Sequence, residues 1–158
     1  MREEPNQDLK WIAVIALVIL GIIFLFPRGN PEVNLCRSVF SGLVRGDYAA
    51  QKFIDWNNLK AVGVDVGAAY SQLPGEREKL NYRQAFIKSL SMGFNQTGAK
   101  LSAFTNWRVY DSSGGRTIIA ADVPKGTRIL FTFLRSPDGK KRLTDIQWKE
   151  PKGADFQP

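Results

Sequence analysis

Histidine is absent from the 158-residue sequence, and cysteine occurs once, as Cys36. The absence of histidine excludes Ser-His-Asp triads, histidine general bases and histidine-containing metal sites. A single cysteine excludes an intramolecular disulfide and a zinc site made of several thiolates of one chain. Metal catalysis would therefore depend on carboxylates alone, and no acidic loop has the spacing of a calcium site. We expect no metal, no cofactor and no catalytic constellation, and we interpret Cys36 as a small buried apolar residue.

Dense clusters of one charge are nearly absent as well. The chain carries 22 Lys and Arg against 15 Asp and Glu, a net charge of +7, but the basic residues are scattered. Their one cluster is Lys140-Lys141-Arg142, beside an Asp-Gly turn. Nucleic-acid binding or an anionic lipid surface could use such charge. A solvated surface that keeps the domain soluble is the simpler interpretation, so nucleic acid is not an expected partner.

One long hydrophobic run is present, WIAVIALVILGIIFLF at residues 11–26. At a rise of ~1.5 Å per residue this run forms about 24 Å of helix, against a hydrocarbon core of about 30 Å. It is apolar on every side, unlike the amphipathic helices of globular cores. Basic side chains flank the run and aromatic ones lie at its ends, as membrane interfaces favour. The sequence predicts a transmembrane helix over residues 11–27, with Trp11, Phe26, Lys10 and Arg28 as the anchoring residues.

A cleaved signal peptide is the main alternative for this run. It requires a small-residue cleavage site, and Pro27-Arg28-Gly29-Asn30-Pro31 offers none. Lys and Arg residues nearly balance on the two sides, so the short tail and its α-amino group favour a cytoplasmic N-terminus. We expect an inner (cytoplasmic) membrane protein whose C-terminal domain is periplasmic or extracytoplasmic. The predicted parts are a tail (1–10), the span (11–27), a linker (28–32), one domain (33–150) and a flexible tail (151–158).

Helical periodicity follows the linker. An apolar stripe from Cys36 to Val44 marks the first helix, and Gly46-Asp47 ends it and caps the next. Glycine and proline break the region after the second helix, and Glu76 favours the N-terminus of a third. The predicted helices cover residues 31–46, 47–59 and 76–96, with a short helical turn within 66–73.

From residue 100 the apolar period changes to two, which is typical of strands. The predicted strands cover residues 103–110, 117–123, 128–134 and 142–149. Short turns join consecutive strands, and the strongest is Ser136-Pro137-Asp138-Gly139, so the strands form an antiparallel meander. The predicted fold class is α+β: one N-terminal transmembrane helix, then three helices packed on a four-stranded antiparallel, curved, cone-like sheet.

This order of elements resembles a known family. A helix, Gly46-Asp47 opening a second helix, a third helix and a meander closing on Arg142-Leu143-Thr144-Asp145-Ile146-Gln147-Trp148 are similar to the nuclear transport factor 2-like, or cystatin-like, domains. The resemblance covers about residues 33–149. It implies a sheet that wraps the long helix into a cone with an open mouth.

Three kinds of relative frame the function that the resemblance implies. The layout looks like the inner-membrane scaffold subunit of type IV secretion systems, although this domain is shorter and lacks their Asn-Pro-x-Gly loop. Periplasmic phospholipid carriers have a third helix that reads like Tyr82-Arg83-Gln84-Ala85-Phe86, and isomerases or dehydratases work inside the cone. The leading prediction is a single-pass anchored binding or scaffold domain of a bacterial envelope assembly, with the bilayer and other envelope proteins as partners. The alternatives are a membrane-tethered carrier of lipid or a small apolar ligand and, third, an enzyme.

The predicted site is the concave side of the sheet, where aromatic side chains at alternating positions point into the mouth. Trp107 is the first candidate for binding a ligand or partner, Tyr110 and Trp148 are the alternatives, and Phe86 is expected at the helix–sheet contact.

An enzyme would draw on acid or base groups among the same elements. The available groups are Asp122, Asp145, Tyr82 and Tyr110. A carboxylate in an apolar pocket has a raised pKa and acts as a general base. The competing interpretation pairs Asp145 with a neighbouring Lys or Arg on the sheet, or exposes it to water, and we favour that one.

Overall fold

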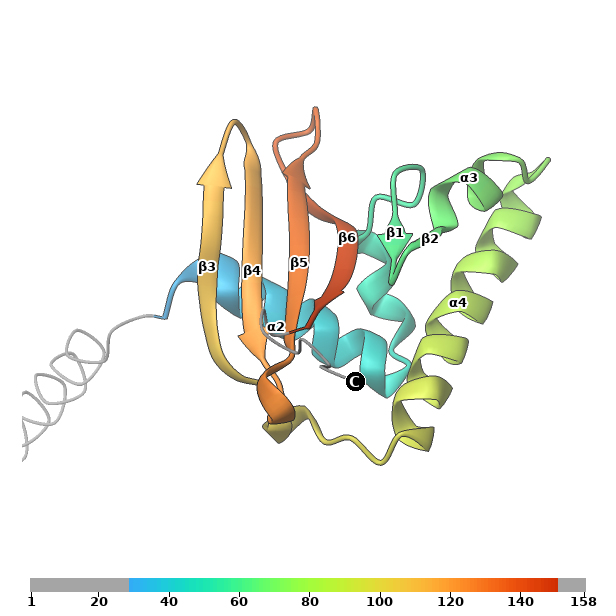
Figure 1. The fold of residues 1–158 in the computed structure, drawn as a ribbon. Helices are drawn as coiled ribbons and strands as arrows, with labels where there is room; N and C mark the ends of the chain where they lie inside the picture. Colours follow the sequence, from blue (N-terminus) through green and yellow to red (C-terminus); the bar gives the residue numbers. More distant parts are fainter. Residues whose placement is uncertain (1–28, 151–158) are drawn as a thin grey trace, which may run out of the picture. The chain divides into compact units, whose positions relative to one another are not determined.

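The structure is a computed structural model that describes residues 29–150. It contains three α-helices, six strands and three short 3-10 helices within that range (Figure 1). In chain order they are α2 (Pro31–Arg45), η1 (Tyr48–Phe53), β1 (Lys60–Ala61), β2 (Val64–Asp65), α3 (Val66–Ser71), α4 (Glu76–Gln96), η2 (Leu101–Ala103), β3 (Thr105–Ser113), β4 (Arg116–Asp122), η3 (Pro124–Gly126), β5 (Arg128–Arg135) and β6 (Lys141–Lys149).

The strands form one mixed sheet in the order β2-β1-β6-β5-β4-β3. The four long strands are an antiparallel meander, whereas β1 runs parallel to β6, with Lys60 opposite Asp145 and Ala61 opposite Ile146. In Figure 1, α2 crosses one face of the sheet, and α4 stands beside the edge that carries β1 and β2. α2 contacts β3, β4 and α4, so it joins the sheet to the long helix.

The predicted fold class is wrong about the sheet, which has six strands of mixed direction rather than four antiparallel ones. The missed strands, β1 and β2, are two residues long and carry no alternating pattern that sequence could reveal. Tertiary contact determines them, because the Val62 amide donates to the Ile146 carbonyl of β6 at 2.8 Å. The meander predicted over residues 103–149 is confirmed as β3 to β6.

The predicted fold class also included a transmembrane helix, and this part needs correction. No helix within residues 29–150 is long and apolar enough to cross a bilayer. The proposed span over residues 11–27, with Trp11, Phe26, Lys10 and Arg28, lies outside the described residues. On this finding we withdraw the single-pass anchor and the inner-membrane localisation.

The second predicted helix, over residues 47–59, is largely replaced by other structure. Only the 3-10 turn η1 forms there, capped by Asp47, whose Oδ1 accepts the Ala49 amide at 2.8 Å. The chain then turns inward: Ile54 pairs with Leu143 of β6, and the Trp56 indole donates to the Gln51 carbonyl at 3.0 Å. Burial of two large side chains beside the sheet therefore outweighs the helical pattern.

The core lies between α2 and the sheet. The apolar stripe predicted on the first helix is confirmed, because all five of its residues are buried: Cys36, Val39, Phe40, Leu43 and Val44. Opposite them lie Ile119, Phe131 and Leu143 of β4, β5 and β6. Cys36 is 1% exposed, and desolvation strongly raises the pKa of its thiol, so it is a small core residue with an unreactive sulfur.

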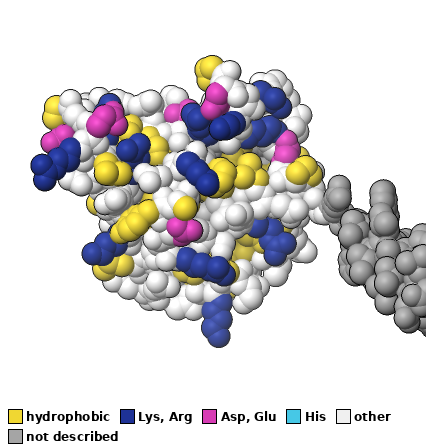
Figure 2. Space-filling model, turned by 180° about the vertical axis from the view of Figure 1, so that it is seen from behind, with side chains coloured by type: hydrophobic (Ala, Val, Ile, Leu, Met, Phe, Trp, Pro, Cys, Tyr) yellow, Lys and Arg dark blue, Asp and Glu magenta, His cyan; other side chains and the backbone are white. Residues whose placement is uncertain are grey.

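The basic cluster at residues 140–142 is partly structural. The Lys141 ammonium binds the Glu32 carboxylate of α2 and lies 2.6 Å from the Thr117 hydroxyl, while Arg142 pairs with Asp138 at 2.7 Å. Figure 2 shows the face turned away from the viewer of Figure 1, where Lys and Arg groups are separated by hydrophobic and other surface. On this face the basic charge is scattered, as the sequence indicates.

Candidate functional site: an apolar pocket beside the long helix

A pocket with a volume of about 500 Å³ lies between α4, the first strand of the hairpin and the inner face of the sheet. We call it the apolar pocket. Its lining residues are almost all apolar: Phe40, Ala61, Val62, Leu90, Gly93, Phe94, Thr97, Ala99, Phe104, Val123, Ile129, Ile146 and Trp148. Five separate stretches of chain therefore build a single apolar surface.

Aromatic rings form one wall of the apolar pocket. Phe40 of α2 is the centre of this group, with its ring centroid 4.9 Å from that of Phe104 and 6.1 Å from that of Phe94. Phe104 also lies 5.9 Å from Phe94 and 6.4 Å from Trp148. Ring pairs at these spacings stabilise each other beyond the area that they bury, so this wall is preformed.

A glycine of α4 is part of the pocket lining. Gly93 lies inside the helix, and a Cβ atom placed on it meets no other atom within 4 Å. Glycine in a helix interior costs roughly 0.5–1 kcal/mol relative to alanine. The helix therefore carries a destabilising residue at a position that lines the pocket and has open space beside it.

The one hydroxyl group of the lining is already satisfied. Thr97 donates its hydroxyl to the Phe94 carbonyl at 2.6 Å, at the C-terminal end of α4. Its oxygen also accepts the Ala99 amide at 3.3 Å. The lining thus presents no unpaired hydroxyl and no ionisable side chain to a ligand.

Two exposed apolar side chains mark the mouth. Val62 is 59% exposed and Trp148 is 44% exposed, and both line the pocket. Val62 has a φ of 51°, a left-handed conformation that β-branched residues rarely adopt. Strain of this kind persists only where surrounding structure imposes it, and it often marks functional positions.

Of the four residues predicted to bind a ligand or partner, Trp148 lies in the pocket lining. Trp107 lies behind the aromatic wall instead: its ring stacks on Phe131 at 5.7 Å, and its indole donates to the Phe104 carbonyl at 2.9 Å. The Arg37 guanidinium covers it from α2, 6.0 Å from the ring centroid. Trp107 is thus half-buried and supports the pocket rather than lining it.

Tyr110 and Phe86 are also outside the lining. Tyr110 is 51% exposed and lies at a break in register between Val109 and Asp111, where the Arg128 guanidinium and the Lys149 ammonium lie 5.8 and 6.0 Å from its ring centroid. Phe86 packs edge-to-face on Trp56, with centroids 5.6 Å apart. It packs from α4 against the core, and its ring partner, Trp56, belongs to the segment that follows η1.

None of the four acid and base candidates is in the lining of the apolar pocket. Asp122 accepts both guanidinium nitrogens of Arg108 at 3.0 and 3.1 Å and the Arg128 Nε at 3.1 Å. Hydrogen bonds from Arg108 and then Arg128 lower the pKa of Asp122 from 3.8 to about 2, so it is a poor proton acceptor. Tyr82 packs on Tyr70, and Asp145 lies on the outer side of β6.

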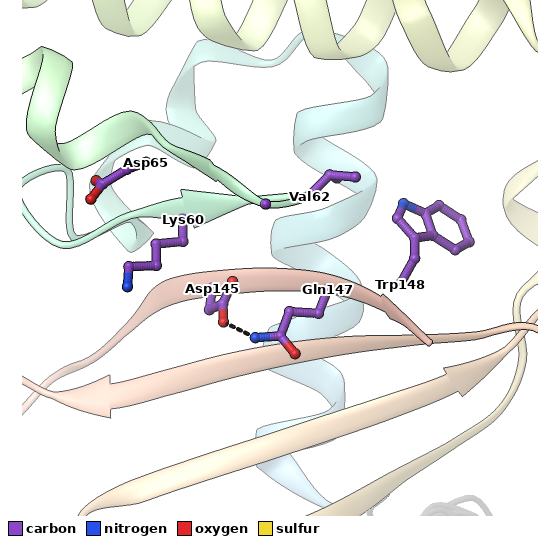
Figure 3. A pocket seen from close by; sticks show the side chains of 7 residues that line it. Lys60, Val62, Asp65, Asp145, Gln147 and Trp148 are labelled. Atoms are coloured by element: carbon purple, nitrogen blue, oxygen red, sulfur yellow. Dashed lines mark hydrogen bonds between the residues drawn. The ribbon is translucent and has the colours of Figure 1, made fainter. Parts of the chain in front are cut away.

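A second pocket, of about 510 Å³, adjoins the mouth and holds Asp145 (Figure 3). We call it the polar pocket. Its lining combines Lys60, Asp65, Asp145 and Gln147 with Val62 and Trp148. The last two residues also line the apolar pocket, so the two pockets share a border.

A third pocket, about 550 Å³, contains the basic cluster together with Leu35, Lys52 and Phe53. Its cations are largely occupied, because Lys141 and Arg142 form the ion pairs described above and Lys52 lies 5.0 Å over the Phe53 ring. Within residues 29–150 no group of three His, Cys, Asp or Glu side chains has metal-site geometry.

Several lining residues were missed at the sequence level. Phe94 and Phe104 look like ordinary core aromatics, and Gly93 looks like a weak position in a helix. Val62-Gly63 carries a turn signal only through its glycine. One available signal was the glycine at 93, because a glycine inside a helix costs roughly 0.5–1 kcal/mol relative to alanine.

Comparisons with known proteins add little to this geometry. No protein-family profile matches the chain, and no curated protein matches it. One similar solved structure is that of a "putative ketosteroid isomerase" from Shewanella frigidimarina NCIMB 400, 14% identical over 73% of this chain and 92% of that chain, with a TM-score of 0.39. A TM-score of this size carries no argument about activity or ligand.

Proposed function

We propose that the domain binds a small apolar ligand in the apolar pocket. The observation that supports this most is the lining: about 500 Å³ of space faced by apolar side chains, with its one hydroxyl bonded internally. Ligand pockets typically span about 300–1,000 Å³ and are lined mainly by hydrophobic and aromatic residues. Among the predicted functions, the carrier of a small apolar ligand fits this lining best, without the tether.

The energy available for such binding is adequate. Burial of a methylene group contributes about 0.8 kcal/mol, so eight of them contribute about 6 kcal/mol before ordering costs. The aromatic wall around Phe40 is held by its own ring contacts, so little reorganisation is needed when a ligand enters. A preorganised apolar wall favours affinity because fewer side chains lose rotamer freedom.

Catalysis is less well supported than binding. An isomerase or dehydratase needs an acid or base within hydrogen-bonding reach of the reacting atom. None of the side chains that line the apolar pocket ionises, and Asp122 is already neutralised by two arginines. The envelope scaffold predicted from the sequence has no support in the fold or in the comparisons.

The experiment fills the pocket from the helix side. The full chain, with Gly93→Phe as the blocking variant and Gly93→Ala as its matched control, is titrated with the neutral fluorescent probe N-phenyl-1-naphthylamine. We expect the wild type and Gly93→Ala to bind the probe, and Gly93→Phe to lose at least about tenfold in affinity because its ring occupies the ligand's space. Circular dichroism and thermal melts check that both variants are folded.

The control separates helix propensity from pocket volume. Gly93→Ala should raise the free energy of unfolding by roughly 0.5–1 kcal/mol, since alanine is the better helix residue. Probe binding that is equal in wild type and folded Gly93→Phe, or absent from the wild type, would contradict the proposed function.

A further inference from the structure

The border between the two pockets suggests what kind of ligand crosses it. Val62 and Trp148 line both the apolar pocket and the polar pocket. In Figure 3 the Val62 side chain extends towards the Trp148 ring, Lys60, Asp65 and Asp145 lie on the other side of Val62, and Gln147 lies below it. A ligand in the apolar pocket can therefore pass over this apolar lip and place its end among polar groups.

The sheet topology creates this crossing point. β1 ends at Ala61, which pairs with Ile146, so the edge of β6 is uncovered from Gln147 onwards. Successive residues of β6 point to opposite faces. Trp148 thus faces the aromatic wall and Gln147 faces the polar pocket, and the open edge between them joins the two sides.

The charge of the polar pocket is unbalanced. Lys60 lies opposite Asp65 on β2 and opposite Asp145 on β6, so one ammonium group is flanked by two carboxylates. The carboxylates are engaged elsewhere in part: Asp65 accepts the Ala68 amide at 2.9 Å, and Asp145 accepts the Gln147 side-chain amide. Among the described residues no ion pair joins either carboxylate to Lys60.

We propose that the ligand is an amphiphile, an inference that rests on the proposed function. Its polar end is neutral or cationic and donates hydrogen bonds, as an amine or a hydroxyl group does. Its hydrocarbon part occupies the apolar pocket, and its polar end crosses Val62 and Trp148 to reach the Asp145 carboxylate. An anionic end is disfavoured, because two carboxylates outweigh the single Lys60 ammonium at short range.

The test compares three ligands with the same chain: octylammonium, octan-1-ol and octanoate, at pH 7 and below their micelle concentrations. Each displaces N-phenyl-1-naphthylamine from the full-length protein, and the affinity is obtained from the displacement curve. We expect octylammonium to bind at least about tenfold more tightly than octanoate. The chain has a net charge of +7, whose long-range field favours anions, so this preference has to arise locally.

Two variants assign the preference to the polar pocket. Asp145→Asn should bring the ratio of the two charged ligands close to one and leave octan-1-ol unchanged, while Lys60→Gln should increase the ratio. Octanoate binding at least as tightly as octylammonium, or a ratio that Asp145→Asn does not change, overturns the inference. If the probe binds but none of the three ligands displaces it, the inference fails alone; if the probe does not bind, the proposed function fails with it.

Discussion

Replacing Val62 with asparagine is expected to stabilise the protein and weaken its binding. Val62 and Gly63 join β1 to β2, and both have positive φ values, 51° and 82°. A two-residue hairpin turn with φ above zero at both positions favours Asn-Gly, whereas valine is among the residues least suited to it. The left-handed conformation costs roughly 1–2 kcal/mol for an ordinary L-residue and less for asparagine.

The magnitude follows from this difference. Val62 is 59% exposed, so asparagine loses little buried apolar area, and we expect Val62→Asn to raise the free energy of unfolding by about 1 kcal/mol. For a domain of this size that corresponds to an increase in Tm of about 3–5 °C. Urea denaturation and thermal melts of the full chain measure both quantities.

Val64 supplies the matched control for this substitution. It is 63% exposed and lies two residues further on, in β2, without a positive φ. Val64→Asn should give no gain in stability, since asparagine is depleted in strands. If Val62→Asn is no more stable than Val64→Asn, the result would contradict a strained left-handed backbone at Val62. A stability gain accompanied by weaker probe binding would identify Val62 as a residue kept for function.

Two further predictions concern groups outside the pocket. The pKa of Asp122 is about 2 in the folded state against an ordinary 3.8, so its contribution to stability is present above pH 4 and lost as the pH falls through 2. In Asp122→Asn the free energy of unfolding should therefore depend less on pH between pH 4 and 2. A pH dependence equal to that of the wild type would contradict the pairing with the two arginines. Cys36 is buried and its thiol pKa is raised, so Ellman's reagent should modify it slowly in the native protein and rapidly in 8 M urea; rapid native labelling would mean that the first helix is not packed as described.

Elements with a strong period of their own could be predicted from the sequence. The helix over residues 76–96 is confirmed as α4, and the turns at 124–126 and 136–139 separate strands close to the predicted ones. The β1–β2 hairpin could not be predicted, because two-residue strands have no period and valine at position 62 is not a usual residue for a tight turn. The helix predicted over 47–59 failed because the sheet offered Ile54 and Trp56 better burial than helical geometry did.

The residues of the candidate site were also predictable only in part. Strict alternation along the strand predicted over residues 103–110 puts Phe104 and Trp107 on opposite faces, yet the centroids of their rings lie only 6.4 Å apart. A break in register between Thr105 and Arg108, with Asn106 at a φ of 50°, turns both side chains inward. A bulge of this kind has only weak sequence signals. Trp148 could be predicted because the last strand pairs regularly from Asp145 to its end, after a break in register at Thr144.

The central claim is that the apolar pocket binds the hydrocarbon part of a ligand, and an NMR titration tests it most directly. Amide chemical shifts of the full chain are followed while octan-1-ol is added. We predict saturable shifts that are largest at Gly93, Thr97 and Ala99, and a loss of these shifts in Gly93→Phe. Shifts that cluster instead around Lys52 and residues 140–142, or that never saturate, would contradict the account.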